Sequence, residues 1–374
     1  MTNKAQQLKA LGQSIWYDNI QRKLLLNGDL AGMVARGEIY GVTSNPSIFH
    51  NAITKSGDYD QALKPLAVSG KSSMEIYESL AIADIQAAAD LFLPLYSESE
   101  GLDGYVSLEV NPNLAHDTEA TSSEAQRLWD LVDRPNLMVK IPATSAGIPA
   151  IESSIAAGIN VNVTLIFSQE RYAEVMAAYL SGLEKRLADG NDLSRIASVA
   201  SFFISRIDNK VDASLEKIGD ESSQHAKIVK QLLGQVAVAN AKLAYQRFKQ
   251  VFEAARFTNL AAHGARFQRP LWASTSTKNP AYSDVKYVEE LVGPNSVNTV
   301  PPDTLAAFED HGQVNFSLEA DVDRALQILR DLELVGVSLP SVTQELEVEG
   351  VKAVADAFAA LLAGIDSRRS SMVG

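Results

Sequence analysis

Short runs rich in β-branched residues alternate along the chain with longer stretches in which apolar residues recur every three or four positions. The first pattern is typical of strands and the second of amphipathic helices. The runs that we interpret as strands are 14–20, 40–45, 105–111, 137–143, 160–167, 196–205, 270–276 and 296–300. The helical pattern is clearest at 169–187 and 226–252, and at 318–334 and 342–362 after the last strand.

Eight strands that alternate with helices predict an α/β protein, namely a (β/α)8 TIM barrel with extra helices. A doubly wound open sheet is the alternative, but we see no glycine-rich nucleotide loop to support it. The chain has 374 residues, whereas a bare barrel needs about 250. We therefore expect a single domain, 1–374, with additional helices at its C-terminus. The segment 69–73 reads as a turn between helices, and the interval 208–269 as one long helix plus a loop.

Composition narrows the possible partners and compartments. The formal net charge is −13 and no basic block offsets it, which argues against nucleic acid or an anionic membrane as a partner. The absence of cysteine excludes disulfides, thiolate catalysis and cysteine-bound metals. We find no secretion signal and no run of about 18 apolar residues. We expect a cytoplasmic protein, and its oligomeric state, monomer or homodimer, stays open.

Polar side chains share one face of several predicted strands. Ser107 and Glu109 alternate with apolar neighbours, Asn162 and Thr164 do the same, and Lys140 stands between two apolar residues. Side chains two positions apart on a strand point the same way. A barrel buries one face under helices and the other inside, so the polar face should point inward. The same pattern places Asp18 with Trp16 in the first strand, and Ser274, Ser276 and Lys278 together in the seventh.

An inward lysine and glutamate permit two interpretations. Lys140 and Glu109 could form a structural ion pair, because a buried charge is costly unless it is paired. Polar groups on five strands favour an active site instead. Low-dielectric walls drive a lysine towards its neutral amine, which can attack a ketone and form a Schiff base. Glu109, Thr164 and Asp18 are then the candidate proton shuttles. The candidates for binding substrate hydroxyls are Asn45, Asn162 and Ser201.

Other kinds of chemistry are poorly supported. The five histidines are scattered, and none forms a pair with metal-ligand spacing. The chain has no Gly-x-Ser-x-Gly run of the kind that carries a serine nucleophile. We therefore expect an enzyme that uses neither a metal nor an organic cofactor.

Five motifs, in order along the chain, resemble those of the transaldolase family. They are TSNPS at 43–47, VSLEV at 106–110, LMVKIPAT at 137–144, NVNVTLIFS at 160–168 and SFFISR at 201–206. Each motif alone is moderately specific, and together they are specific. The resemblance implies a (β/α)8 barrel without a cofactor that acts on sugar phosphates.

The resemblance also implies roles for individual residues. Lys140 would form the Schiff base, and Glu109 and Thr164 would hold the water that moves protons. Asp18 would remove the proton from the hydroxyl beside the breaking bond. Binding of the dihydroxyacetone moiety would fall to Asn45, Asn162 and Ser201, while Phe203 would line the site and Arg206 would grip the distal phosphate.

Two segments depart from the shorter members of the family. The stretch 272–280 ends in Ser-Thr-Lys-Asn-Pro, where those members carry an arginine for the phosphate. We assign that role to Lys278, with a solvated loop lysine as the alternative. The long interval 208–269 makes the chain most similar to the longer bacterial branch. For Arg206, an ion pair with Asp208 or with another carboxylate on the rim is the alternative to phosphate binding.

The implied reaction belongs to the pentose phosphate pathway. It converts sedoheptulose 7-phosphate and glyceraldehyde 3-phosphate into erythrose 4-phosphate and fructose 6-phosphate. A fructose 6-phosphate aldolase of the same superfamily is the nearest alternative, but such aldolases usually carry Gln and Tyr where this chain has Glu109 and Phe203. A non-catalytic barrel that only binds sugar phosphates is a further alternative, against which the intact Lys140, Glu109 and Asp18 speak.

Overall fold

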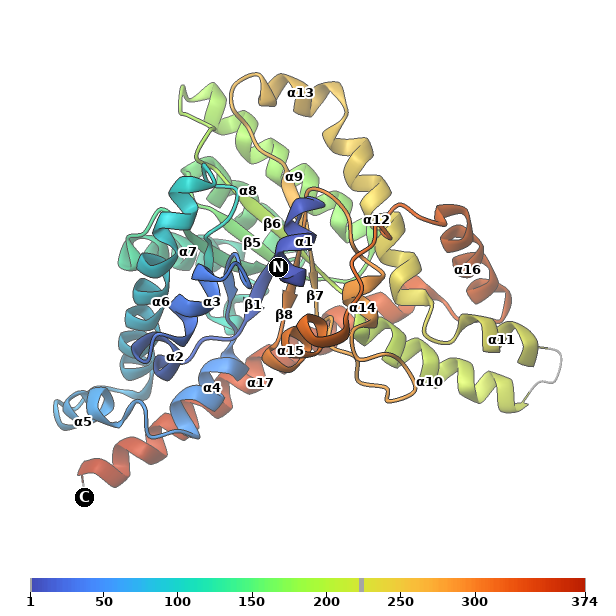
Figure 1. Ribbon diagram of the computed structural model, residues 1–374. Coiled ribbons are helices and arrows are strands. Elements are labelled where there is room, and N and C mark those ends of the chain that lie inside the picture. The colour runs from blue at the N-terminus through green and yellow to red at the C-terminus, as the bar shows by residue number, and fades with distance from the viewer. Residues whose placement is uncertain (1, 222–224, 374) are drawn as a thin grey trace.

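A computed structural model describes residues 2–221 and 225–373 of the chain (Figure 1). Eight parallel strands close into a barrel in chain order. They are β1 Gln13–Asp18, β2 Val42–Thr43, β3 Val106–Glu109, β4 Leu137–Pro142, β5 Val161–Ile166, β6 Ser198–Phe203, β7 Gln268–Ala273 and β8 Ser296–Val300. Because β1 pairs with both β2 and β8, the sheet has no open edge. The predicted barrel and its eight strands are confirmed, and the open doubly wound sheet is wrong.

Helices surround the strands and extend beyond the last of them. They are α1 Lys4–Ala10, α2 Arg22–Leu26, α3 Asp29–Ala35, α4 Pro46–Thr54, α5 Asp60–Val68, α6 Ser73–Glu98, the 3₁₀ helix η1 Pro112–Leu114, α7 Thr118–Val132, α8 Gly147–Ala157, α9 Gln169–Ala188, α10 Ser205–Glu221, α11 Ala226–Leu232, α12 Val236–Phe252, α13 Ala255–Ala261, α14 Lys286–Glu289, α15 Pro302–His311, α16 Val322–Leu334 and α17 Leu339–Val373. The predicted turn at 69–73 lies between α5 and α6, as expected. The two helices expected after the last strand are present as α16 and as α17, which is longer at both ends than predicted.

The interval 208–269 contains more than the one long helix and loop that we expected. Most of α10 lies in it, followed by α11, α12 and α13. The predicted helix 226–252 is interrupted at Gly234, whose φ is +67°. A Cβ at Gly234 would lie 2.6 Å from the ring of Tyr282. Glycine adopts this left-handed conformation without strain and is therefore common where helices end. The break was not predicted because apolar residues keep a helical spacing on both sides of it.

The seventh strand was placed too late in the sequence. β7 begins before Pro270 and ends at Ala273, because Ser274 adopts a left-handed φ of +55° that an extended strand does not allow. Ser274, Ser276 and Lys278 therefore lie in the loop that follows β7, and their predicted alternation on a strand is wrong. The second strand is also shorter than expected, with only Val42–Thr43 in the sheet.

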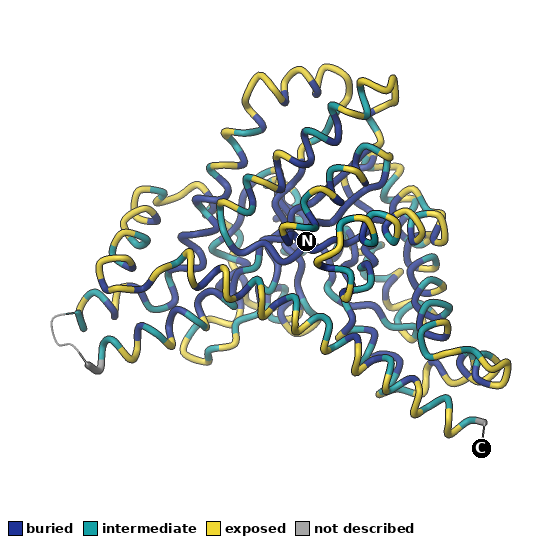
Figure 2. The backbone as a smooth tube through the Cα atoms, turned by 180° about the vertical axis from the view of Figure 1, so that it is seen from behind, coloured by how far each residue is buried: buried dark blue, intermediate teal, exposed yellow. Residues whose placement is uncertain are grey.

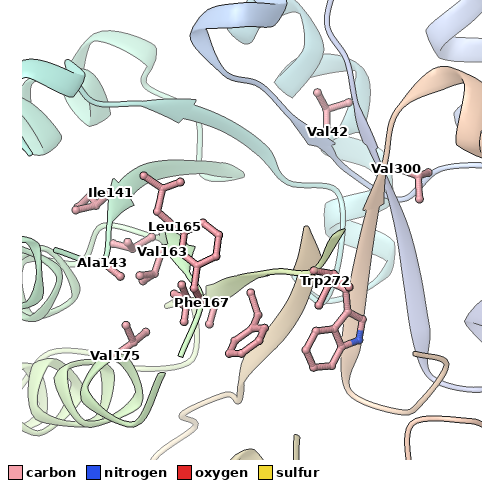
Figure 3. Packing of buried hydrophobic residues seen from close by; sticks show 14 of the residues in the cluster. Val42, Ile141, Ala143, Val163, Leu165, Phe167, Val175, Trp272 and Val300 are labelled. Atoms are coloured by element: carbon pink, nitrogen blue, oxygen red, sulfur yellow. The ribbon is translucent and has the colours of Figure 1, made fainter. Parts of the chain in front are cut away.

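The outward faces of the strands are apolar and pack against the helices. Ile141 of β4 and Val163 of β5 belong to one buried cluster with Val175 of α9 (Figure 3). Helix α6 has the length and hydropathy of a membrane-spanning helix, but its buried residues pack within this shell against β3, α5 and α7. Its buried Asp84 accepts hydrogen bonds from Arg22 and Tyr59. These contacts make α6 a covering helix of the barrel.

The barrel interior has two chemically different halves. Towards the N-terminal ends of the strands, Trp16, Tyr105, Met138 and Val199 form a separate apolar cluster. Two residues further along the same strands, the inward side chains are polar. These polar residues are Asp18 on β1, Ser107 on β3, Lys140 on β4 and Ser201 on β6. The apolar half thus forms a floor beneath a polar upper half.

Helix α17 crosses the molecule near the C-terminal ends of the strands (Figure 1) and packs against α4, α5, α6 and α10. Gly350 permits its close approach to the barrel, since a Cβ there would lie 3.1 Å from Leu165 Cδ2. Near the end of the helix, Arg368 donates hydrogen bonds to the backbone carbonyls of Ile53 and Ser56. Seen from behind, the helix alternates between exposed and partly or fully buried residues (Figure 2).

Candidate active site

Lys140 lies inside the barrel with only 8% of its surface exposed. Its Nζ donates a hydrogen bond of 3.2 Å to the backbone carbonyl of Ser44. Strand pairing sets Lys140 opposite Glu109 of β3 on one side and opposite Asn162 of β5 on the other. Because paired residues on neighbouring strands point to the same side of the sheet, the three side chains lie at one level of the barrel.

Glu109 forms an ion pair with Lys140. Its Oε2 lies 3.6 Å from Lys140 Nζ, which is close enough for charge attraction but too long for a hydrogen bond. Burial raises the pKa of Glu109, Lys140 opposes this rise, and the nearby Asp18 adds to it. The same Oε2 is buried and makes no hydrogen bond within residues 2–221 and 225–373. The expected pair is therefore present, and one buried carboxylate oxygen has room in its hydrogen bonding for a water molecule.

Asp18 ends β1 and faces the same space. Its Oδ1 accepts a hydrogen bond of 2.7 Å from Thr43 Oγ1. Thr43 has used its only hydroxyl hydrogen there, so it accepts the hydrogen of Thr299 over 2.6 Å. Burial raises the pKa of Asp18, while Lys140 and Thr43 lower it only in part. Two carboxyl groups with raised pKa values thus flank one lysine, an arrangement common where protons are transferred.

A chain of hydrogen bonds crosses the barrel beside Lys140. Ser201 Oγ donates to Asn162 Oδ1 over 2.7 Å, and Asn162 Nδ2 donates to Ser107 Oγ over 3.0 Å. The three residues come from β6, β5 and β3, and β4 lies between the last two strands, so these bonds run through the interior. This confirms the prediction that the polar faces of these strands point inward. Asn162 is fully buried, and Ser201 lies between it and the cavity.

The segment Thr43–Pro46 forms part of the cavity wall and the start of α4. Asn45 caps α4, because its side chain accepts a hydrogen bond of 3.0 Å from the backbone N–H of Ile48. Pro46 follows at the first helical position, where its missing N–H is not needed. Ser44 donates through Oγ to the backbone carbonyl of Ser107 over 2.7 Å, and its own carbonyl accepts from Lys140. The motif therefore positions the lysine as well as the helix.

Arg206 stands at the opposite end of the site, in the first turn of α10. Its guanidinium lies 5.3 Å from the centre of the Phe203 ring. Burial lowers the pKa of Arg206, with Glu349 acting the other way, but an arginine stays cationic in proteins. Asp208 does not pair with it, since its two oxygens accept from the backbone N–H of Ala237 and from the hydroxyl of Tyr287. The alternative of an Arg206–Asp208 ion pair is therefore wrong.

A cavity of about 430 Å³ brings most of the predicted residues together. Those that line it are Asp18, Asn45, Lys140, Thr164, Ser201, Phe203, Arg206 and Lys278. Glu109 and Asn162 do not line it, but each interacts with a residue that does, Glu109 with Lys140 and Asn162 with Ser201. Lys278 is exposed and reaches the cavity from the loop after β7. The cavity thus has a buried lysine between carboxyl groups and two cations, Arg206 and Lys278, on its wall.

Several residues that line the cavity, or that hold its lining side chains in place, were not among the predicted site residues. Thr43 and Thr299 hold Asp18, and Ser107 holds Asn162. Ser205 and Ser274 share a hydrogen bond of 3.0 Å beside Arg206. Ser107 and Ser274 had been placed on polar strand faces and could have been included, whereas the contacts of the others depend on distances across the barrel. Among the described residues, no group of three His, Cys, Asp or Glu side chains could hold a metal ion.

Comparison with known proteins gives a consistent result over nearly the whole chain. Residues 15–365 match the family described as Transaldolase/Fructose-6-phosphate aldolase. A protein of Trichodesmium erythraeum named Transaldolase is 46% identical over 374 aligned residues, covering 98% of each chain. Transaldolase 2 of Nostoc punctiforme is 49% identical with the same coverage. Transaldolase of Thermobifida fusca is 50% identical and covers 94% of each chain.

Proposed function

This chain belongs to the transaldolase/fructose-6-phosphate aldolase family, and we propose that it transfers a dihydroxyacetone unit between sugar phosphates through a Schiff base on Lys140. The full-length relatives at 46–50% identity are transaldolases, which makes the chain a transaldolase. Its reaction converts sedoheptulose 7-phosphate and glyceraldehyde 3-phosphate into erythrose 4-phosphate and fructose 6-phosphate. The observation that carries the residue assignment is the enclosed Lys140, 3.6 Å from Glu109.

In the first step, we propose that neutral Lys140 Nζ attacks the C2 carbonyl of the ketose phosphate. The C2–O bond then breaks, its oxygen leaves as water, and a protonated C2=N imine forms. The departing oxygen takes one proton from the attacking nitrogen and a second from a general acid, which recovers its proton when water later hydrolyses the imine. Glu109 has a raised pKa and a buried oxygen without a protein partner. It would act through a water molecule held together with Thr164.

In the second step, Asp18 would remove the proton from the C4 hydroxyl. The electrons of the C3–C4 bond move into the imine, the aldehyde phosphate leaves, and an enamine of dihydroxyacetone stays on Lys140. The enamine then attacks the aldehyde carbon of the acceptor by the reverse of these steps. Burial raises the pKa of Asp18, which brings the carboxylate closer to the basicity that a general base requires.

The remaining residues would hold the substrate in place. Asn45 and Ser201 would bind the hydroxyl groups of the dihydroxyacetone part, and Asn162, which does not line the cavity, would act through its hydrogen bond with Ser201. Phe203 would exclude water beside them. Arg206 and Lys278 would bind the distal phosphate, since both line the cavity. We propose that the enzyme works in the cytoplasm without a metal or an organic cofactor.

Borohydride trapping tests the assignment of Lys140. With fructose 6-phosphate, reduction should leave a stable three-carbon adduct that mass spectrometry finds on Lys140. Lys140→Ala should lose the adduct and nearly all activity. Lys140→Arg should fail as well, because a guanidinium stays protonated and cannot act as the amine.

Lys242→Ala is the matched control, since Lys242 is also a partly buried lysine but lies on α12 outside the cavity. It should keep both the adduct and the activity. Persistent trapping in Lys140→Ala would show that another residue forms the Schiff base.

A further inference from the structure

A second cavity of about 430 Å³ opens at the other end of the barrel. Met138 and Val199 form its inner wall, two residues before Lys140 and Ser201 on the same strands. Helix α13 closes one side, at the end of the molecule opposite to α17 (Figure 1). The two cavities share no residue. This volume lies within the roughly 300–1,000 Å³ of small-molecule sites.

The wall of this lower cavity is largely apolar and aromatic. Phe257 of α13 lies with its ring centre 5.2 Å from that of Phe267. Phe267 is still 37% exposed, although both rings line the cavity together with Tyr105. An exposed aromatic ring beside an apolar recess gains stability when an apolar group covers it, at about 25 cal/mol per Å² of apolar surface removed from water. The recess therefore favours an apolar body.

One cation lies at the cavity with part of its hydrogen-bonding capacity unused. Arg266 is held at its Nε, which donates to the backbone carbonyl of Ser194 over 2.7 Å. Its own carbonyl accepts a hydrogen bond of 2.8 Å from Tyr179. Within residues 2–221 and 225–373, its terminal nitrogens have no carboxylate partner. A fixed guanidinium with free terminal N–H groups suits an anion with two oxygens, which it can hold with parallel hydrogen bonds.

The surroundings of Arg266 are positive, although the chain carries a net charge of −13. Arg269 is 6% exposed and pairs with Asp103 over 3.0 Å, but Lys9 pairs with the same carboxylate. The charged residues that line this cavity, or the smaller cavity that shares Arg266 with it, are Arg195, Arg266 and Arg269 against Glu100. An excess of cations around an apolar space attracts an anion more than a cation.

We infer that the lower cavity binds a small molecule with an aromatic or bulky apolar body and one anionic group. The anion lies on Arg266, and the body lies between Phe257, Phe267 and the inner wall at Val199. This site is separate from the cavity around Lys140 and does not depend on the reaction that we propose there.

Calorimetric titration with three probes tests both parts of the site. The probes are 2-naphthoate, its uncharged analogue 2-naphthamide, and acetate. 2-Naphthoate should bind tenfold to a hundredfold more tightly than 2-naphthamide, because a hydrogen bond to a charged group is worth about 1.5–3 kcal/mol. Acetate should bind too weakly to measure. Fructose 6-phosphate should not displace 2-naphthoate, which separates this site from the one around Lys140.

Two variants locate the binding. Arg266→Met removes the charge and should reduce 2-naphthoate affinity to that of 2-naphthamide, whereas Arg330→Met removes an exposed arginine on α16 and should change nothing. Ala261→Trp should fill the rim of the cavity and abolish binding of both aromatic probes. Its control is Ala262→Trp, which alters the neighbouring exposed position outside the lining. Circular dichroism checks that each variant is folded.

Several results would overturn the inference. They are no heat of binding with 2-naphthoate, equal affinities for 2-naphthoate and 2-naphthamide, displacement by fructose 6-phosphate, and unchanged affinity in folded Arg266→Met. If Ala261→Trp does not fold, Arg266→Met and the displacement experiment still decide the matter. None of these measurements uses enzyme activity, so a failed Schiff-base assignment and a failed lower site give different results.

Discussion

At the scale of single residues, the register of the strands alone sets Lys140 beside two of its candidate partners. Lys140 is opposite Glu109 and Asn162 because β4 pairs in register with β3 and β5. Glu109 and Asp18 both face the lysine, and burial raises the pKa of each carboxyl group. Asp18 adds to the raised pKa of Glu109, and Lys140 opposes the rise at both carboxyl groups. The local environment, more than the residue types, thus prepares them for proton transfer.

The raised pKa of Asp18 predicts opposite effects of Asp18→Asn on activity and stability. The folded protein takes up a proton on Asp18 at a higher pH than the unfolded chain, whose ordinary value is 3.8. The ionised Asp18 carboxylate therefore lowers the stability of the folded protein. This effect is complete at pH values above the raised pKa and is absent at pH values below 3.8. We expect Asp18→Asn to unfold at a higher denaturant concentration than the wild type at pH 7, and to lose this advantage below the unfolded pKa. Activity should fall about 10²- to 10⁴-fold, as for loss of a general base.

Urea unfolding across this pH range and a coupled transfer assay measure the two effects of Asp18→Asn. Asp58→Asn is the control, since Asp58 is exposed and outside the cavity. It should change neither stability nor rate appreciably. A less stable Asp18→Asn protein at pH 7 would mean that the ion pair with Lys140 outweighs the cost of burial.

The alternation of polar and apolar residues was enough to find most of the site, but not its internal bonds. Side chains two apart on a strand share a face, so Lys140, Glu109 and Asn162 could be predicted. Which groups meet across the barrel depends on strand tilt and on side-chain rotamers, which alternation does not describe. For this reason Thr299, which supports Thr43 beneath Asp18, was not predicted.

At the scale of elements, the turns after the strands define the site as much as the strands do. In the turn between β4 and α8, the chain passes so close to the end of β4 that a Cβ at Gly147 would lie 2.0 Å from the carbonyl oxygen of Pro142. That oxygen belongs to the backbone and cannot rotate away. The turn follows Lys140 by only a few residues, so its geometry affects the strand that carries the lysine.

Gly147→Ala should therefore destabilise the protein and reduce activity together. We expect a loss of about 1–3 kcal/mol in the free energy of unfolding, the usual range when extra atoms force a backbone shift. Gly57→Ala is the control, because its Cβ would meet only the Asp60 carboxylate at 3.6 Å. Chemical denaturation of both variants makes the comparison, and equal stabilities would show that the turn relaxes freely.

We expect the first turn of α10 and the loop after β7 to bind the phosphate of the substrate together. Arg206 can hold phosphate with two parallel hydrogen bonds, whereas Lys278 acts as a single charge and is exposed. We expect Arg206→Ala to lower kcat/KM for phosphorylated donors about tenfold to a hundredfold, and Lys278→Ala to lower it less.

To test whether Arg206 and Lys278 bind the phosphate, kcat/KM is compared for phosphorylated and unphosphorylated donors. Only the phosphorylated donor should be penalised in each variant. If Arg206→Ala lowers kcat/KM equally for both donors, the arginine does not bind the phosphate. A Lys278→Ala enzyme that matches the wild type would support a solvated loop lysine.

The elements themselves were predicted best where the chain alternates regularly. The eight strands could be predicted because each is a short run between stretches with a helical pattern. The prediction failed where one residue changes direction without disturbing the apolar period, as at Gly234 between α11 and α12. It failed also at Ser274, because a left-handed φ on a serine has no composition signal.

At the scale of the whole molecule, the barrel separates an apolar floor from a polar upper half. The described residues contain no group of three His, Cys, Asp or Glu side chains that could hold a metal ion, and the reaction that we propose uses the lysine and polar groups of the upper half. We expect activity to survive exhaustive dialysis against a chelator such as EDTA. A transfer assay before and after dialysis measures this, and activity that disappears and returns only with added zinc would contradict the Schiff-base proposal.

The position of α17 has a consequence for the synthesis of the protein in the cell. The helix covers α4 and α6, which leave the ribosome long before it, and Phe358 lies with its ring centre 5.4 Å from that of Tyr77. Domains fold as units during translation, so a nascent chain without α17 must leave these apolar faces uncovered. A ribosome that stalls before residue 339 would therefore release a chain with exposed apolar surface, which is a substrate for chaperones and proteases.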